Sequence, residues 1–317
     1  MLRTFGGIAL FTTIALGLAT PVRAEDGFDA AALAAKAASL LRTHYVDAKR
    51  GDEIATAIER KAQAGAYAAL DREAFAQAIT RDLRSASDDG HLYVRRNDRP
   101  PPRDPAAREA AERAREAETN HGFTEVRVLP GNVGYLRIVE FMHPQRSFET
   151  ANAAMRFLQD TRALILDLRG NGGGYGGLPE YLATFYFDDE PQLLSSVRAR
   201  NADTATMSSW TFPAVAGTRR TGTPAYVLVD GKTASAAEWL AYTLQAFGKA
   251  KVVGEPSAGG ANHNEFFELD PQLRLSVSVT SPISAATGGN WEGKGVIPDV
   301  PSASAQALDT ALQLARP

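Results

Sequence analysis

The segment Ala-Tyr-Val-Leu-Val-Asp-Gly-Lys-Thr-Ala-Ser-Ala-Ala-Glu, residues 225–238, carries the strongest signal for the fold of this chain. Its first five residues are apolar and lead to Asp230-Gly231, and an apolar-periodic segment follows over residues 239–247. This order predicts a buried strand, a tight turn and a helix. Such units, repeated along a chain, are typical of α/β folds.

Ser235 stands at the predicted start of that helix. A hydroxyl group there lies near the positive end of the helix dipole and near amide groups without intrahelical partners. The position suits a nucleophile whose attack creates an oxyanion. It equally suits an ordinary N-cap, for which serine is favoured, with Glu238 as the capping-box partner. This segment alone leaves both interpretations open.

Short apolar strands alternate with helices from Gly122 onward, which predicts an α/β architecture with right-handed crossovers. The predicted strands are residues 126–129, 133–138, 163–168, 193–197, 225–229 and 251–253, with a later hairpin of 266–269 and 273–279. The predicted helices are residues 148–159, 178–185, 235–247 and 303–314. We therefore expect residues 122–317 to form one α/β domain.

The first 121 residues predict three further segments. Residues 1–24 combine Arg3, a short apolar run and small residues at Val22 and Ala24, which is typical of a signal peptide cleaved after Ala24. An uncleaved membrane anchor is the alternative, although the run is short for a transmembrane span. Residues 25–90 predict a small helical domain, and residues 91–121 a linker followed by a charged, solvated helix.

Composition narrows the classes of function. The chain has 317 residues, a formal net charge of −3 and no cysteine. This small negative net charge does not indicate binding to nucleic acid or to anionic lipid. The absence of cysteine excludes disulfides and a thiol nucleophile. We expect a periplasmic or secreted protein that is not inserted in a membrane after removal of the signal peptide.

A glycine cluster follows the predicted strand at residues 163–168, within Arg-Gly-Asn-Gly-Gly-Gly-Tyr-Gly-Gly, residues 169–177. Glycine-rich turns between a strand and a helix expose amide groups to an anion. Gly172, Gly174 and Gly177 also have the spacing of a dinucleotide site. An oxyanion-binding loop fits the polar residues before the glycines better, and a flexible turn is the third interpretation.

A nucleophilic serine needs a base, and histidine is the usual one. Of the five histidines, His91 is the strongest candidate because it ends a polar turn, residues 87–90, at the start of an apolar strand. His263 also follows a strand and glycines and is expected to line the same cleft. The remaining histidines, His44, His121 and His143, lie in segments without other catalytic signals.

The third member of a triad orients the imidazole and stabilises its charged form. Glu292 fits this role because it lies in a glycine-flanked loop late in the chain. Glu238 and Glu255 are the competing candidates.

Together these segments resemble peptidase family S41, the C-terminal-processing and tail-specific proteases. The matching segments, in the family's order, are Leu-Asp-Leu-Arg-Gly-Asn-Gly-Gly-Gly at 166–174, Thr-Ala-Ser-Ala-Ala-Glu at 233–238, Val-Gly-Glu-Pro at 253–256 and Gly-Val-Ile-Pro-Asp at 295–299. The resemblance implies a crotonase/ClpP-like αβ core and a serine peptidase that acts on peptide or protein substrates without a metal or organic cofactor.

One departure from the family's pattern selects the branch. Processing proteases place a lysine base where this chain has Gly260. The chain is instead similar to the branch with tricorn core proteases and the interphotoreceptor retinoid-binding protein, which implies a Ser235–His91–Glu292 triad. Residues 91–122 hold only a linker and a charged helix, so we expect the family's intervening PDZ domain to be absent. The resemblance also implies an oxyanion site of amide groups from Ala236 and from Gly173 or Gly174. The retinoid-binding relative keeps a second function open, the binding of an apolar ligand or peptide, and a non-peptide acyl hydrolase is the third.

Overall fold

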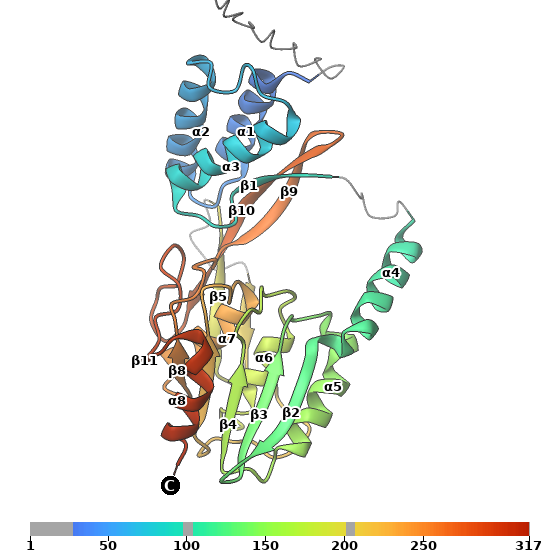
Figure 1. Ribbon diagram of the computed structural model, residues 1–317, viewed down its shortest axis with the longest axis vertical. Coiled ribbons are helices and arrows are strands. Elements are labelled where there is room, and N and C mark those ends of the chain that lie inside the picture. Colours follow the sequence, from blue (N-terminus) through green and yellow to red (C-terminus); the bar gives the residue numbers. More distant parts are fainter. Residues whose placement is uncertain (1–27, 98–103, 201–206, 317) are drawn as a thin grey trace, which may run out of the picture.

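The structure of the protein is a computed structural model that describes residues 28–97, 104–200 and 207–316. The predicted signal peptide lies outside the described residues. None of the helices in the described part of the chain is both long and apolar enough to cross a membrane. The chain forms an upper helical part and a lower α/β part, which a long hairpin joins (Figure 1).

The lower part is built on a six-stranded sheet with the order β11-β8-β7-β4-β3-β2. Neighbouring strands run parallel from β11 to β3, and only β2 is antiparallel to its neighbour. The strands are β2 (Phe123–Leu129), β3 (Val133–Ile138), β4 (Ala163–Asp167), β7 (Ala225–Val229), β8 (Lys251–Gly254) and β11 (Val300–Pro301). The predicted α/β architecture is confirmed.

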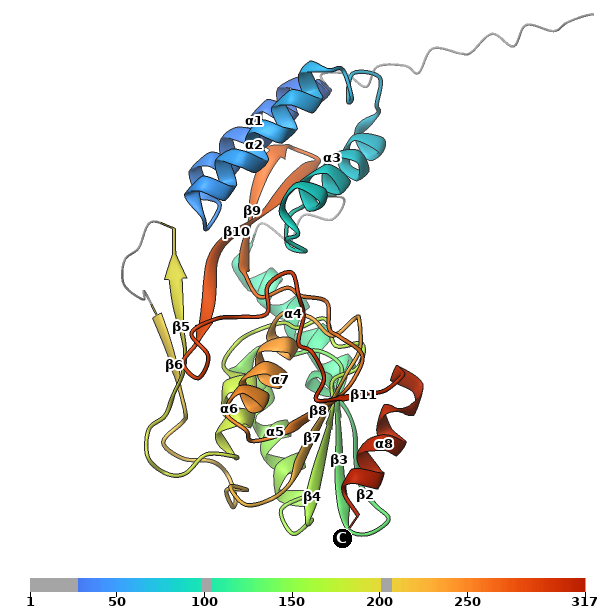
Figure 2. The same cartoon turned by 90° about the vertical axis from the view of Figure 1, so that its left-hand side faces the viewer.

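Helices cover both faces of this sheet, as the buried runs of β4 and β7 require. Alternate strand residues such as Leu164 and Leu166 share one core with α5 (Pro144–Phe157), α6 (Leu178–Thr184) and α7 (Ala236–Ala246). The intervening residues, including Ile165, pack against α8 (Ala307–Leu314), which follows a short 3-10 turn, Ser304–Gln306. Figure 2 shows α8 on the opposite side of the sheet from α7.

The upper part contains α1 (Ala30–His44), α2 (Ala48–Gln63) and α3 (Arg72–Ser87), each of which begins at an aspartate N-cap. Their apolar faces do not pack on one another alone. They share a core with the hairpin β9 (His263–Asp270) and β10 (Leu273–Ser284), including Leu269, Leu275 and Val277. The predicted helical segment is therefore completed by strands from more than 170 residues later in the chain.

The hairpin belongs to a second sheet with the order β1-β10-β5-β6, in which β9 pairs with β10. The other strands are β1 (Tyr93–Arg96), β5 (Leu193–Ala199) and β6 (Met207–Trp210). Strand β10 pairs with β1 at its start and with β5 at its end. The turn that follows α3, residues 88–92, leads into β1 and so into this sheet.

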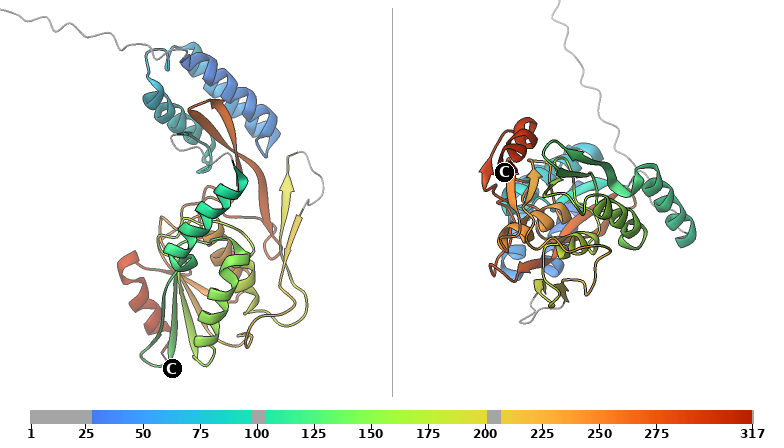
Figure 3. Two further views of the ribbon diagram at one scale, coloured as in Figure 1. Left: turned by 90° about the vertical axis from the view of Figure 1, so that its right-hand side faces the viewer. Right: turned by 90° about the horizontal axis from the view of Figure 1, so that it is seen from below.

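Helix α4 (Pro105–Glu118) runs along the side of the molecule toward the α/β part (Figure 3). Most of it is exposed, as predicted, but its last turn is not a solvated face. Glu116 is fully buried and accepts hydrogen bonds from the side chain of Arg146 and from the amide of His143. The described residues between His91 and Gly122 form only β1, α4 and a 3-10 turn, Asn120–Gly122, so no PDZ domain is built from them.

Candidate active site

Ser235 occupies a sharp turn between β7 and α7. Its backbone has φ 53° and ψ −120°, which L-residues rarely adopt and which costs on the order of 1–3 kcal/mol. A strained strand-to-helix turn is one way in which hydrolases expose a nucleophilic serine. The surrounding structure holds this conformation, because the amide of Ser235 donates to Glu238 Oε2 at 2.8 Å.

Glu238 is a fully buried carboxylate with a complete set of donors. Besides the amide of Ser235 it accepts hydrogen bonds from Ser257 Oγ at 2.5 Å and from the amides of Gly259 at 2.6 Å and Gly260 at 2.9 Å. The predicted capping-box contact from the Glu238 side chain is present, and the same side chain also fixes the loop after β8. Glu238 therefore serves as a structural anchor rather than as a free acid.

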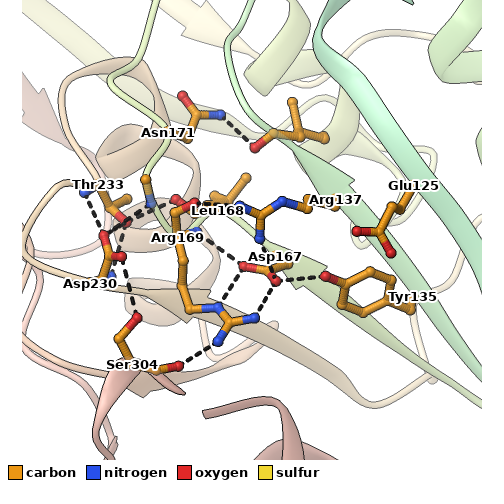
Figure 4. A network of polar contacts seen from close by, with 12 residues as sticks. Glu125, Tyr135, Arg137, Asp167, Leu168, Arg169, Asn171, Asp230, Thr233 and Ser304 are labelled. Atoms are coloured by element: carbon orange, nitrogen blue, oxygen red, sulfur yellow. Dashed lines mark hydrogen bonds and ion pairs between the residues drawn. The ribbon is translucent and has the colours of Figure 1, made fainter. Parts of the chain in front are cut away.

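The glycine loop is fastened to the Ser235 turn by several hydrogen bonds (Figure 4). Asp230 Oδ1 accepts the amide of Gly170 at 3.0 Å from one loop and the amide of Lys232 at 3.0 Å from the other. Thr233 Oγ1 donates to the carbonyl of Leu168, and Ala234 N donates to the carbonyl of Asn171. The two loops that the sequence singled out therefore form one unit.

Gly173 lies directly against Ser235. A Cβ atom at this position would come within 2.6 Å of Ser235 Cβ, so only glycine permits the approach. The amide of Gly173 donates to Asn171 Oδ1 at 2.8 Å, which removes it from the expected donors. The amides of Gly174 and Ala236 have no hydrogen-bond partner among the described residues, and these two remain as candidates for an oxyanion site.

His91 reaches this region from the turn after α3. Its amide donates to Asp89 Oδ1 at 2.8 Å, and its ring lies over Gly260. A Cβ atom at residue 260 would be 2.8 Å from His91 Cε1. The imidazole therefore lies in the space that a side chain at residue 260 would enter, so a side chain there requires the His91 ring to move. No hydrogen bond joins His91 to Ser235 in the described part of the chain, and catalytic contacts often tighten only when substrate is bound.

Glu292 lies beside His91. Its Oε2 atom accepts the amides of Ala261 and Asn262, both at 2.7 Å. One polar side-chain atom from each of Asp89, His91 and Glu292 lies within 4.8 Å of the other two. That spacing would also admit a cation, but three of the four carboxylate oxygens already accept hydrogen bonds, so we assign the group no metal.

Two polar atoms of this group are buried without a hydrogen-bond partner among the described residues, His91 Nδ1 and Glu292 Oε1. Burial lowers the pKa of His91, against the opposing charges of Asp89 and Glu238. Burial, followed by the charge of Asp89, raises the pKa of Glu292 to about 8. His91 is thus neutral and able to accept a proton near neutral pH.

Next to Ser235 is a cavity of about 410 Å³. Its walls include the apolar side chains of Val197, Trp239 and Trp291, together with Ala236 and His263. His263 therefore lines the same cleft as Ser235, as predicted from the sequence. Burial lowers the pKa of His263, and its Nδ1 atom lies 3.1 Å from Thr280 Oγ1.

The other candidates lie away from this group. The ring of His44 stacks on Phe267 in the upper part, and the ring of His143 lies 5.4 Å from that of Tyr175. His121 has a left-handed backbone in the 3-10 turn after α4. Glu255 is exposed and accepts the amide of Ser304. Sequence reasoning missed Asp89, whose neighbours Asp88 and Gly90 made it look like an ordinary turn residue.

Two family profiles and several known proteins match the chain. The profile of peptidase family S41 matches residues 132–302, and that of the N-terminal domain of Peptidase_S41 in eukaryotic IRBP matches residues 29–124. The carboxy-terminal-processing protease of Bartonella bacilliformis is 27% identical over 179 residues, which is 54% of this chain and 39% of that protein. The chain therefore spans well under half the length of that relative.

Solved structures with this fold include a lipoprotein from Streptococcus agalactiae, with a TM-score of 0.58 and 17% identity over 90% of this chain and 95% of that one. The photosystem II D1 C-terminal processing protease has a TM-score of 0.53 and 17% identity over 87% and 94%. These likenesses confirm the predicted αβ fold. Since the S41 profile covers more than half of the sequence and contains the four motifs read from it, the chain belongs to peptidase family S41.

Proposed function

We propose that this protein is an exported serine endopeptidase that hydrolyses peptide bonds through Ser235, His91 and Glu292. The observation that carries the proposal is the placement of the His91 ring over Gly260, at the position where the resembling proteases carry a lysine base. The chain lacks a lysine at that position, and His91 is the base that we propose in its place. The peptidase relative and the predicted signal peptide support the remaining parts of the proposal.

In this mechanism His91 takes the proton of Ser235 Oγ as that oxygen attacks the peptide carbonyl. Glu292 orients the imidazole and stabilises its charged form. The amides of Ala236 and Gly174 receive the oxyanion, and loss of one such donor costs about 3 kcal/mol in the transition state. His91 then gives its proton to the leaving amine, and water hydrolyses the acyl-enzyme.

A fluorophosphonate probe tests the nucleophile without knowledge of the substrate. We expect the purified protein to be labelled once, at Ser235, and the Ser235→Ala variant to remain unlabelled. Ser39→Ala is the matched control for the loss of a hydroxyl group, because Ser39 is exposed on α1 and does not line the cavity. Absence of labelling in the folded wild type would reject the proposal.

The cavity favours a second candidate, the binding of an apolar ligand, because Trp239, Trp291 and Val197 give it a largely apolar wall. Titration with a fluorescent fatty acid separates the two functions. A binding protein would take up the probe equally well in the Ser235→Ala variant and would show no fluorophosphonate labelling. Labelling with turnover of esters but of no peptide in a peptide library would indicate a non-peptide acyl hydrolase.

A further inference from the structure

Asp89 is a buried carboxyl group whose partners come from distant parts of the chain. Only 1% of its surface is exposed. Its Oδ1 atom accepts the amide of His91 at 2.8 Å, and its Oδ2 atom accepts the hydroxyl of Tyr45 at 3.1 Å and the Nδ2 group of Asn262 at 3.4 Å. Asp89 thus joins the end of α1, the turn after α3 and the segment that enters β9.

The carboxyl group of Asp89 also faces Glu292. One side-chain oxygen of each residue lies within 4.8 Å of the other, and Asp89 contributes the largest charge effect on Glu292. Two carboxylates this close cannot both ionise easily in a buried site, so such pairs retain a proton between them. The unpartnered Oε1 atom of Glu292 agrees with this, because a bare buried anion without a donor is costly.

We infer that Asp89 is a positioning residue of the proposed triad, which fixes the backbone of His91 and shares one proton with Glu292, so that the pair keeps a single negative charge beside the imidazole. The inference rests on the proposed function for its catalytic meaning. The carboxyl pair itself is a property of the folded protein and can be tested separately.

Other charged and titratable groups surround the pair. Tyr45 donates to Asp89, and Arg50 on α2 acts electrostatically on Tyr45. Arg84 on α3 and Glu238 on α7 act on His91, and His91 in turn acts on His263. Burial and then Asp89 raise the pKa of Tyr45, so its hydroxyl stays protonated and remains a donor throughout the working range of pH.

Two variants of this pair should move the pH dependence of Ser235 reactivity in opposite directions. Full ionisation of Glu292 stabilises the imidazolium form of His91, so reactivity of Ser235 should rise with pH through the ionisation of Glu292. Asp89→Asn removes the neighbouring charge but keeps an oxygen for the amide of His91, so this rise should move by about 1 pH unit or more to lower pH. Tyr45→Phe removes a donor from Asp89, so the pair should hold its proton more tightly and the rise should move to higher pH.

The experiment measures the second-order rate constant of fluorophosphonate labelling between about pH 5 and pH 9.5 in the wild type, Asp89→Asn and Tyr45→Phe. Opposite displacements of the two variants support the inference. Profiles that differ only in height would show a merely structural role for Asp89 and overturn it. If Asp89→Asn does not fold, the direction of the displacement in Tyr45→Phe still decides.

A second measurement does not depend on activity. NMR titration of ¹³C-carboxyl-labelled glutamate in Ser235→Ala, with Glu292 assigned by the loss of its signal in Ser235→Ala/Glu292→Gln, should show Glu292 titrating near pH 8. Titration of Glu292 near its ordinary value of 4.5 would overturn the shared proton. Because this readout needs no nucleophile, failure of labelling in the wild type rejects the proposed function without touching the carboxyl pair.

Discussion

Four consecutive amides, from Gly259 to Asn262, divide between two carboxylates. The first two donate to Glu238, and the last two donate to Glu292. Glu238 uses both oxygens and has additional donors from Ser235 and Ser257. Glu292 accepts both amides on one oxygen and keeps Oε1 buried and unpartnered. The two acids share one segment of backbone and differ in how completely they are satisfied.

That difference separates an anchor from a reactive group. A carboxylate with four donors is held as a rigid anion and supports the strained turn at Ser235. Glu292 has one carboxylate oxygen without a partner among the described residues, a raised pKa and a neighbouring histidine, and such a group can bind a proton or an imidazole. We therefore expect Glu238 to stabilise the fold and Glu292 to take part in the proposed reaction, and three variants test this expectation.

Glu292→Gln should show the largest effect, on activity. The substitution keeps an oxygen for the amides of Ala261 and Asn262 but removes the charge that Glu292 carries above its pKa of about 8, which stabilises the imidazolium form of His91, so the rates are compared at about pH 9. We expect kcat/KM, or the rate of fluorophosphonate labelling, to fall about 10³- to 10⁴-fold, equivalent to about 4–5.5 kcal/mol. Glu255→Gln, at an exposed glutamate with one backbone contact, is the matched control and should keep full activity.

The same variant should change how stability depends on pH. The pKa of Glu292 in the folded protein is raised from 4.5 to about 8, so the folded state binds this proton more tightly than the unfolded state. Its contribution to stability is therefore complete below about pH 4.5 and is lost as pH rises to about 8, a change on the order of 2 kcal/mol after allowance for partial solvent exposure. Urea unfolding of Glu292→Gln should lack this decline, and an unchanged slope would contradict the assignment.

The part of the site around Ser235 could be predicted from the sequence because its sequence signals are local. The strand, turn and helix around Ser235 and the glycines at 172–174 are each contained in a few consecutive residues. Asp89 could not be found in this way. Asp-Asp-Gly at residues 88–90 is an ordinary turn sequence, and only the tertiary contacts with Tyr45 and Asn262 bury the second aspartate.

The fold shows the same limit. Apolar periodicity predicted that residues 25–90 are helical and located most strands of the lower part within a few residues. It did not show that β9 and β10 complete the core beneath α1 to α3, because alternating residues such as Leu273, Leu275 and Val277 specify a buried face without specifying its partner. Pairing across more than 170 residues depends on the whole chain.

Glu238→Gln should cost stability first. The substitution replaces a buried anion that accepts four hydrogen bonds with an amide, whose nitrogen would face donors instead of receiving from them. We expect a loss on the order of 3 kcal/mol in the free energy of unfolding, measured by urea titration. Glu255→Gln serves again as the control and should change stability by less than about 0.5 kcal/mol. If Glu238→Gln were as stable as the wild type but inactive, Glu238 would belong to the chemistry and the comparison would fail.

Gly260→Ala should have the smallest effect, and it tests the placement of the base. The new Cβ atom would lie 2.8 Å from Cε1 of His91, closer than such contacts occur, so the half-buried ring must shift. A small displacement of a catalytic group reduces the rate while the protein still folds, so we expect about a 10-fold loss in labelling rate.

Gly90→Ala is the matched control, because a Cβ atom there meets no atom within 4 Å although residue 90 adjoins His91 in the chain. Equal labelling rates in Gly260→Ala and the wild type would mean that the ring over Gly260 is not the base. In that case His263, which lines the same cavity as Ser235, would be the next residue to replace.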